Sequence, residues 1–140
     1  MKATELMKGD WVYNTHNRQP EQVCEIMEHM VMLAYNDLYD YDEIEPIPLT
    51  SEILEHNGFK LREGCTSAWD WHNGETSIHI SGNHTCHIGQ TLTIYVPGGT
   101  AGAAFSSHRA ISDLKIRGVH ELQHALRLCH INKEIKTKED

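Results

Sequence analysis

The sequence lacks any long run of apolar residues. Nothing in its 140 residues approaches the roughly 18 consecutive apolar residues of a membrane-spanning helix. The first residues, MKATELMKGDW, also lack the apolar core of roughly 7 to 15 residues that a secretory signal peptide carries. We therefore expect a cytoplasmic protein that does not engage a membrane.

Closely spaced cysteine pairs are also missing. Cys24, Cys65, Cys86 and Cys129 are spread along the chain and form no C-x-x-C pair. Structural zinc sites usually take their ligands at close spacing, and a cytosolic protein keeps its thiols reduced. We expect free thiols that pack as small hydrophobic side chains, and no cofactor.

Positive charge is scarce as well. Lysine and arginine number 12 against 20 aspartates and glutamates, so the net charge is −8 with the histidines neutral. Proteins that bind the phosphate backbone of DNA or RNA are usually basic. Generic nucleic-acid binding is therefore disfavoured.

The glycine-rich segment PGGTAGAAFSS, residues 97–107, carries no complete phosphate-binding motif. It has neither the G-x-x-x-x-G-K-[ST] pattern nor the G-x-G-x-x-G pattern. A flexible connector is the favoured interpretation. A small-ligand site in which residues 97–103 hold phosphates stays open as an alternative.

The first 49 residues predict a small β-unit. Strand-like stretches at 11–13, 23–26 and 30–35 are separated by polar turns, a spacing typical of barrels and sandwiches. The opening G-D-x-V, followed by V-x-x-I, is frequent in SH3-like barrels. We expect an SH3-like barrel over residues 1–49, which ends at the extended stretch EPIPL.

Residues 50–140 predict a second, α+β unit that begins with a short helix. In TSEILEHNG, Thr50 or Ser51 is a capping residue and Asn57-Gly58 is a left-handed stop. The stretches SAWDWH, TSIHI and TLTIYV then alternate as antiparallel strands do. Asn73-Gly74 predicts a two-residue hairpin between the first two of these strands.

The end of the chain predicts one more strand and a helix. LKI, at 114–116, favours a strand, and Gly118 precedes a helix that carries an apolar stripe. NKEIKTKED, the last nine residues, is expected to fray as a charged tail. The fold class is α+β: an N-terminal SH3-like barrel, a short linking helix, and an antiparallel sheet packed by the C-terminal helix.

The last helix contains a full match to H-E-x-x-H at His120, Glu121 and His124. Histidines at i and i+4 on one helix face bind zinc in metalloproteases, and the glutamate activates the metal-bound water. His130 stands at the offset of a third ligand. These four residues make a zinc-dependent hydrolase one alternative.

The surroundings of the match argue against zinc. The known three-histidine motif has a glycine three residues before the last histidine, where this chain has Arg127. A helix that continues through Arg127 turns His130 about 120° away from His124. No methionine follows Met32, so the methionine turn of these proteases cannot form, and another ligand would have to come from His84, His87 or His108.

A packing helix explains the same residues. An apolar stripe at helical spacing consists of Val119, Leu122, Leu126 and Cys129. His120 and His124 then lie on the other side, where a surface helix carries polar residues. We interpret the H-E-x-x-H match as accidental and expect no enzymatic activity.

Three other groups are candidates for binding. His84, Cys86 and His87 would suit a metal, although a polar hairpin or loop explains them. Tyr39 and Tyr41 lie in an acidic stretch that is typical of a solvated edge strand. Trp69 and Trp71 share one face of a strand and would form an aromatic recognition surface, although core packing is favoured.

Three blocks of the sequence resemble one family. ELMKGDWVYN, DEIEPIPLTSEILEHNGF and VHELQHALRLC are similar to the pattern ELxxGxWV, IxPIPLTxExLxxxGF and VHxLQ of small uncharacterised proteins from Bacteroidetes prophages and mobile elements. In that family other residues often stand at the places of Glu121 and His124. The resemblance therefore implies a structural VHxLQ motif, and it covers residues 62–110 only loosely.

These observations predict a non-enzymatic binding or accessory protein of a phage or mobile element, with a protein partner as one possibility. Its binding surface is expected at Tyr39 and Tyr41 or at Trp69 and Trp71. The alternatives are the zinc hydrolase and a protein that sequesters a small nucleotide-like ligand in opposition to host defence. The sequence does not specify an oligomeric state.

Overall fold

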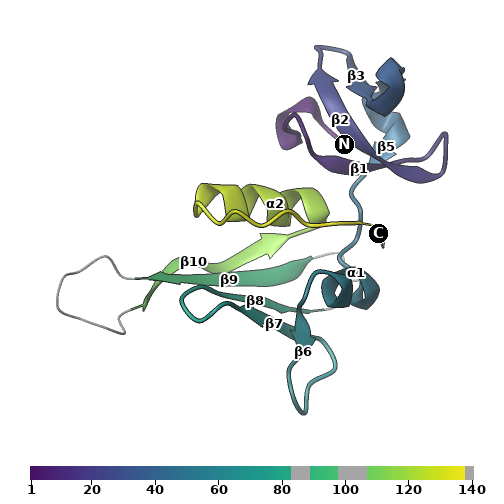
Figure 1. Ribbon diagram of the computed structural model, residues 1–140. Coiled ribbons are helices and arrows are strands. Elements are labelled where there is room, and N and C mark those ends of the chain that lie inside the picture. Colours follow the sequence, from purple (N-terminus) through teal and green to yellow (C-terminus); the bar gives the residue numbers. More distant parts are fainter. Residues whose placement is uncertain (83–88, 98–106, 138–140) are drawn as a thin grey trace.

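The protein is an α+β chain with two antiparallel sheets of five strands each. The computed structural model describes residues 1–82, 89–97 and 107–137. All strands of the first sheet lie before the segment 46–50, and all strands of the second lie after it. Figure 1 shows the two sheets on opposite sides of the C-terminal helix.

The first sheet has the strand order β4-β3-β2-β1-β5. Its strands are β1 (Trp11–Asn14), β2 (Gln19–Ile26), β3 (Met30–Leu33), β4 (Leu38–Asp40) and β5 (Ile44–Glu45), and short 3-10 turns occupy Ala3–Glu5, Ala34–Asn36 and Tyr41–Glu43. Buried residues alternate along β1 and β3, which gives this sheet a core of its own. Within the described ranges the outer strands β4 and β5 do not pair, so no closed barrel is found and the SH3-like barrel stays a prediction.

The second sheet is a meander in the order β10-β9-β8-β7-β6. Its strands are β6 (Lys60–Leu61), β7 (Ala68–His72), β8 (Ser77–Ser81), β9 (Gln90–Pro97) and β10 (Ser107–Ile116). The predicted alternation is confirmed, because Ile78 and Ile80 of β8 and Leu92 and Ile94 of β9 are all fully buried. The strand predicted around LKI is also confirmed, and it extends over the whole of β10.

Helix α1 (Ser51–His56) has the predicted cap. The Thr50 hydroxyl accepts the N–H of Ile53 at 3.3 Å, which satisfies one of the free donors at the start of the helix. Gly58 follows at a positive φ of 86°, a conformation that glycine adopts without strain. The helix packs Leu54 into the core of the second sheet.

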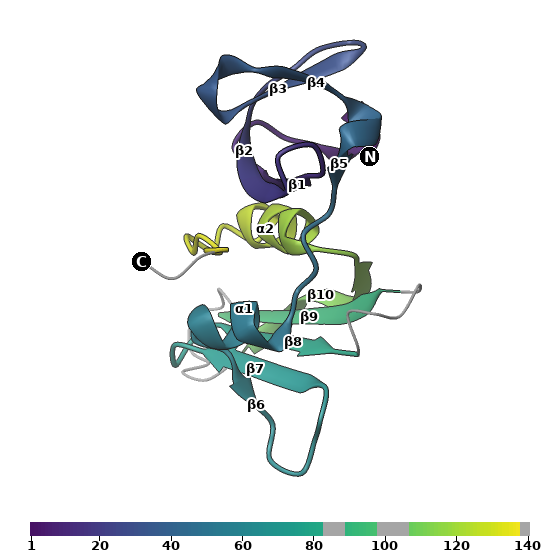
Figure 2. The same cartoon turned by 90° about the vertical axis from the view of Figure 1, so that its right-hand side faces the viewer.

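Helix α2 (Val119–Leu128) lies between the two sheets. Figure 2 shows α1 and α2 on the same face of the second sheet, so the opposite face carries no described helix. The apolar stripe of α2, including Leu122 and Leu126, is buried against the second sheet. None of the helices in the described ranges is long and apolar enough to cross a membrane.

The predicted fraying of the C-terminal segment is wrong as far as residue 137. Ile135 is 2 % exposed, and two buried amide side chains hold the backbone beside it. Gln123 accepts the Ile135 N–H and donates to the Lys133 carbonyl, at 2.8 and 2.9 Å. Asn57 exchanges two hydrogen bonds with the backbone of Lys136, both at 2.8 Å.

Substitutions of a buried and an exposed leucine of α2 test this packing. Leu122→Ala should lower the free energy of unfolding by about 2–5 kcal/mol, because it leaves a cavity against the second sheet. Leu128, which is 77 % exposed, supplies the control on the same helix, and Leu128→Ala should cost less than about 0.5 kcal/mol. Urea unfolding followed by tryptophan fluorescence measures both, and equal losses would contradict the arrangement.

Candidate functional site

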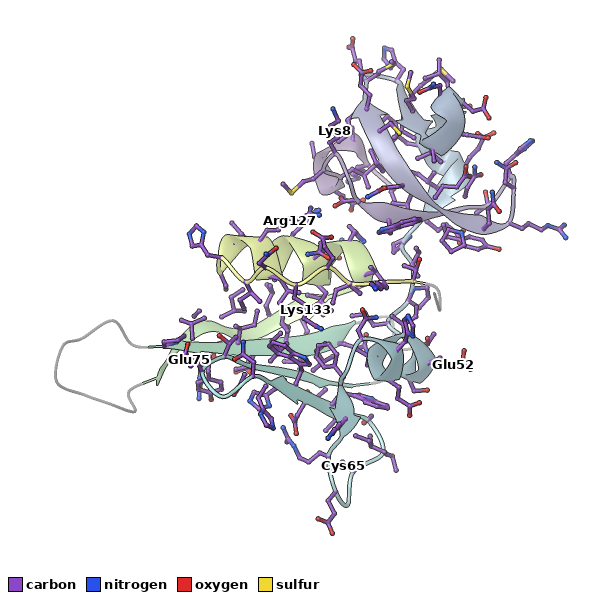
Figure 3. The ribbon with its side chains drawn as sticks, in the orientation of Figure 1. Lys8, Glu52, Cys65, Glu75, Arg127 and Lys133 are labelled. Carbon is purple, nitrogen blue, oxygen red and sulfur yellow. The ribbon has the colours of Figure 1, made fainter. Side chains whose placement is uncertain are left out.

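The H-E-x-x-H helix uses its second histidine to hold the first sheet. His124 Nε2 lies 2.8 and 2.7 Å from the two carboxylate oxygens of Asp10, and Asp10 is 1 % exposed. The Met7 N–H also donates to this carboxylate at 2.7 Å, and Arg127 Nη1 lies 3.6 Å from it. Figure 3 shows Arg127 on the side of α2 that faces the first sheet. The nitrogen that would bind zinc is therefore occupied by a carboxylate of the same chain.

The predicted solvent-facing position of His120 is wrong. His120 is 2 % exposed, because the first sheet covers the face of α2 that periodicity assigns to solvent. Its Nδ1 has no hydrogen-bond partner among the described residues, and its ring meets that of His124 edge-on with centroids 5.8 Å apart. Burial lowers the pKa of His120 below its usual value of 6.5, so the ring is held neutral.

The remaining residues of the alternative zinc site do not assemble around these histidines. Glu121 accepts hydrogen bonds from the backbone and side chain of Arg117. The helix does continue through Arg127, and His130 follows its end as an exposed residue at a positive φ of 57°. No group of three metal-binding side chains occurs in the part of the chain that the structure describes.

The tyrosines predicted as a binding surface belong to the first sheet. β4 is an edge strand, as predicted, but Tyr39 is 8 % exposed and lies in the core. Its hydroxyl accepts a hydrogen bond from Asn17 at 2.9 Å. Tyr41 packs against the same core, and its hydroxyl donates to the carbonyl of Met27. The Tyr39 ring, predicted as part of a partner-binding surface, therefore lies in the core.

The two tryptophans point to one side of β7, as predicted, and that side faces the core. Trp69 is 6 % exposed, and Trp71 is partly buried at the rim of the same core. The ammonium of Lys133 lies 4.8 Å from the centroid of the Trp71 ring, and burial lowers the pKa of this lysine. Core packing is thus the correct interpretation of the pair.

Several predicted candidates lie outside the described residues. They include His84, Cys86 and His87, and all but the first residue of the proposed phosphate-binding segment 97–103. His108 lies in β10, and only the backbone of this residue is described. Among the described cysteines, Cys24, Cys65 and Cys129 are free thiols.

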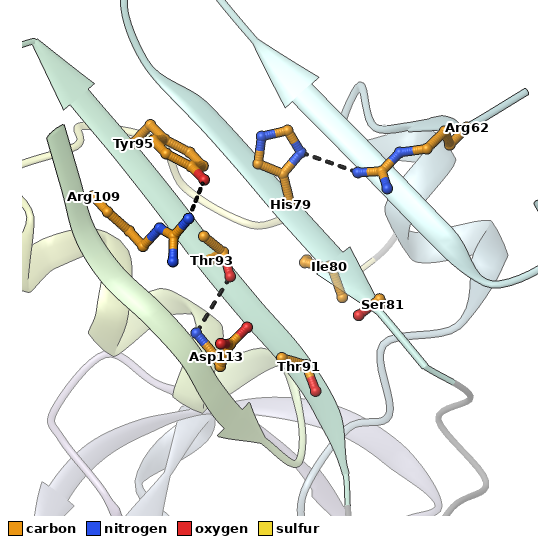
Figure 4. A pocket seen from close by; sticks show the side chains of 9 residues that line it. All are labelled: Arg62, His79, Ile80, Ser81, Thr91, Thr93, Tyr95, Arg109 and Asp113. Atoms are coloured by element: carbon orange, nitrogen blue, oxygen red, sulfur yellow. Dashed lines mark hydrogen bonds between the residues drawn. The ribbon is translucent and has the colours of Figure 1, made fainter. Parts of the chain in front are cut away.

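A polar depression of about 400 Å³ lies on the outer face of the second sheet, away from α1 and α2 (Figure 4). Strand register places outward-facing side chains in transverse rows, because directly opposed residues share one face of a sheet. The rows are His72–Ser77–Tyr95–Arg109, Lys60–Asp70–His79–Thr93 and Ala68–Ser81–Thr91–Lys115. The middle of the face is thus rich in hydroxyl groups, and cationic side chains stand at both sides.

Asp70 organises the side of the face formed by β6 and β7. Its carboxylate accepts hydrogen bonds from Nε and Nη2 of Arg62 at 3.0 and 2.7 Å, and it lies 2.5 Å from Nδ1 of His79. The hydrogen bonds from Arg62, supported by His79, lower the pKa of Asp70 to about 2. Asp70 therefore fixes the orientation of both side chains at the edge of the depression.

Arg109 and Tyr95 form the opposite side, on β10 and β9. Arg109 donates from Nη2 to the Tyr95 hydroxyl at 3.0 Å and from Nη1 to the Ser112 hydroxyl at 3.2 Å. Its guanidinium carbon also lies 5.4 Å from the centroid of the Tyr95 ring. Both acceptors are neutral, and Arg109 forms no ion pair within the described ranges. No described carboxylate therefore pairs directly with its guanidinium, although Asp113 lines the same depression.

Two register shifts in β10 complete this side of the depression. They occur between Arg109 and Ile111 and between Ile111 and Leu114, and bulges of this kind re-aim side chains. Asp113 adopts a positive φ of 52° there, and its N–H donates to the Thr93 hydroxyl at 3.3 Å. Lys115, beyond the second shift, donates to the Thr91 hydroxyl at 2.7 Å.

Only one feature of this face was predictable from the sequence. Alternation along β8 predicts that Ser77 and His79 face outward, and they do. The residues that make the face cationic, Arg62 and Arg109, are far apart in the sequence, and only the strand order places them on the same face. The bulges of β10 leave no clear pattern in the sequence.

No protein-family model, no curated protein and no solved structure matches this chain. The resemblance to the Bacteroidetes prophage proteins is therefore neither supported nor opposed by these comparisons.

The buried neutral His120 predicts a loss of stability in acid. The fold lowers the pKa of His120, so below pH 6.5 the unfolded chain binds a proton that the folded chain does not bind. The free energy of unfolding therefore decreases as the pH is lowered. The contribution approaches about 1.4 kcal/mol per pH unit below that value. His120→Leu should flatten this dependence in urea unfolding between pH 7.5 and 5.5.

The exposed His29 provides the matched control for this experiment, since its side chain is 85 % exposed. His29→Leu should leave the pH dependence as in the parent chain. If His120→Leu and His29→Leu have the same effect, the acid sensitivity does not arise from the buried ring.

Proposed function

We propose that the chain is a non-enzymatic binding protein and that the depression on the outer face of the second sheet takes a small anionic ligand with a phosphate group. The observation that carries this proposal is the hydrogen bonding of Arg109. Two neutral hydroxyl oxygens orient its guanidinium, and no described carboxylate pairs with it, so it can bind an anionic ligand. Arginine suits phosphate because its planar fork donates two hydrogen bonds at once.

The surrounding groups favour a small ligand over an extended polyanion. The hydroxyls of Thr91, Thr93 and Ser81 line the depression and are suited to the polar body of a sugar. The chain as a whole carries a net charge of −8, which repels a long nucleic acid. A compact molecule with a phosphate group can contact the positive charge of the depression without lying over the acidic surface of the rest of the chain.

This proposal relocates the binding surface and keeps the expected class of function. The tyrosines and tryptophans predicted to form the binding surface pack in or against the two cores. The outer face of the second sheet, in contrast, has no described helix over it. An accessory role in a phage or mobile element rests on the resemblance of the sequence blocks alone. An SH3-like topology for residues 1–49 is part of the same proposal and rests on the opening sequence pattern.

Arg109→Ala tests the proposal directly. Adenosine 5′-monophosphate is the probe, and isothermal titration calorimetry at low salt measures its affinity. A hydrogen bond to a charged group contributes about 1.5–3 kcal/mol, so the substitution should weaken binding by about 10- to 100-fold.

Lys8→Ala is the control, because it removes one positive charge from an exposed position on the first unit, away from the second sheet (Figure 3). It should leave the affinity within about twofold of the parent value. If Arg109→Ala and Lys8→Ala bind the probe equally well, or if the parent chain binds none, the proposed site is wrong.

A further inference from the structure

The outer face of the second sheet has two cationic sides. Lys60 lies on β6, Arg62 directly follows that strand and binds Asp70 of β7, and the register pairs Lys60 directly with Asp70. This side carries two cations and one carboxylate.

The opposite side, on β9 and β10, repeats the same composition. Arg109 and Lys115 provide the cations, opposite Tyr95 and Thr91, and Asp113 provides the carboxylate. Each side therefore has a net charge of one positive when His79, between them, is neutral.

The anchor residues define the spacing of the two sides. Arg62 is fixed on β7 through Asp70, and Arg109 is fixed on β9 through Tyr95. The residues that hold them, Asp70 and Tyr95, are two strands apart and offset by two residues along the sheet, which corresponds to roughly 12 Å between their Cα atoms. The two arginines are thus held by different strands, and each can take a phosphate of its own.

The surface between the two cationic sides is suited to an uncharged ring. The imidazole of His79 on β8 meets the ring of Tyr95 on β9 edge-on, with centroids 5.6 Å apart, and Figure 4 shows both rings at the same end of the depression. Thr93 follows His79 in the same transverse row. Aromatic edges and hydroxyls of this kind contact a sugar or a base.

We infer that the depression selects a ligand with two separated phosphate groups, one for each cationic side, joined by a nucleoside-sized body. This inference rests on the proposed function, since it specifies the ligand of the same site. A nucleoside 3′,5′-bisphosphate has this chemistry, and so does a short phosphodiester-linked nucleotide. Neighbouring phosphates, as in a 5′-diphosphate, would crowd onto one side and leave the other unused.

Calorimetry with three probes tests the inference: adenosine 5′-monophosphate, adenosine 5′-diphosphate and adenosine 3′,5′-bisphosphate. The two doubly phosphorylated probes share the base, the sugar and the number of phosphates, and they differ in where the phosphates lie. The 3′,5′-bisphosphate should bind at least tenfold more tightly than the 5′-diphosphate. Adenylyl-(3′→5′)-adenosine carrying a 5′-phosphate, used as a fourth probe, distinguishes a linked dinucleotide from a free bisphosphate as the better ligand.

Lysine substitutions supply a second measurement. Lys60→Ala and Lys115→Ala remove one charge from each side, and both residues are exposed, so the fold should persist. Each should weaken the 3′,5′-bisphosphate about three- to tenfold, whereas the monophosphate should respond to only one of them. Arg62→Ala is avoided, because it would uncover the Asp70 carboxylate and repel any anion.

The outcomes separate the two proposals. If all probes fail to bind, the phosphate site itself is wrong and this inference falls with it. If the monophosphate and the 5′-diphosphate bind as tightly as the 3′,5′-bisphosphate, the site takes phosphate and the two-sided selection is overturned. Equal responses of the monophosphate to both lysine substitutions would overturn it as well.

Discussion

The arrangement of the two sheets depends on one buried carboxylate. Asp10 stands at 1 % exposure at the start of the first sheet, and it receives His124 and Arg127 from a helix that follows it by more than a hundred residues in the chain. A buried carboxylate without partners is strongly destabilising, so the first sheet and α2 must stay together for Asp10 to be satisfied. The same helix buries its apolar stripe against the second sheet. Helix α2 thus packs against both sheets, with polar contacts to the first sheet and apolar contacts to the second.

This role explains the H-E-x-x-H match without a metal ligand. The spacing that aligns two histidines on one helix face also aligns them toward the first sheet, where His124 meets Asp10 and His120 is enclosed beside it. Glu121 turns to Arg117, which also reaches Glu5 of the first unit at 3.4 Å. The hydrogen bond that the Lys2 N–H donates to Glu5 lowers the pKa of that carboxyl. Polar residues that periodicity assigns to solvent are used here in an interface within the chain.

Local features of the fold were predictable from the sequence, and contacts between distant segments were not. The cap at Thr50, the alternation of Ile78 and Ile80, and the shared face of the tryptophans follow from short-range rules and are confirmed. The hairpin at Asn73-Gly74 was located correctly, but its loop spans residues 73–76, because the Asn73 side chain accepts the backbone N–H groups of Glu75 and Thr76. His120 and Tyr39 were misplaced, since periodicity identifies the faces of an element and not what covers them. The proposed phosphate site was not predictable for the same reason, since only the strand order brings Arg62 and Arg109 to one face of the sheet.

A double-mutant cycle between Asp10 and His124 tests the central claim most directly. The free energy of unfolding is measured for the parent chain, Asp10→Asn, His124→Ala and the double variant, under conditions free of metal ions. If the pair holds the first sheet to α2, the two substitutions should be strongly non-additive, with a coupling energy of about 1–3 kcal/mol. A coupling energy indistinguishable from zero would contradict the account, because the contact between Asp10 and His124 would then not stabilise the fold.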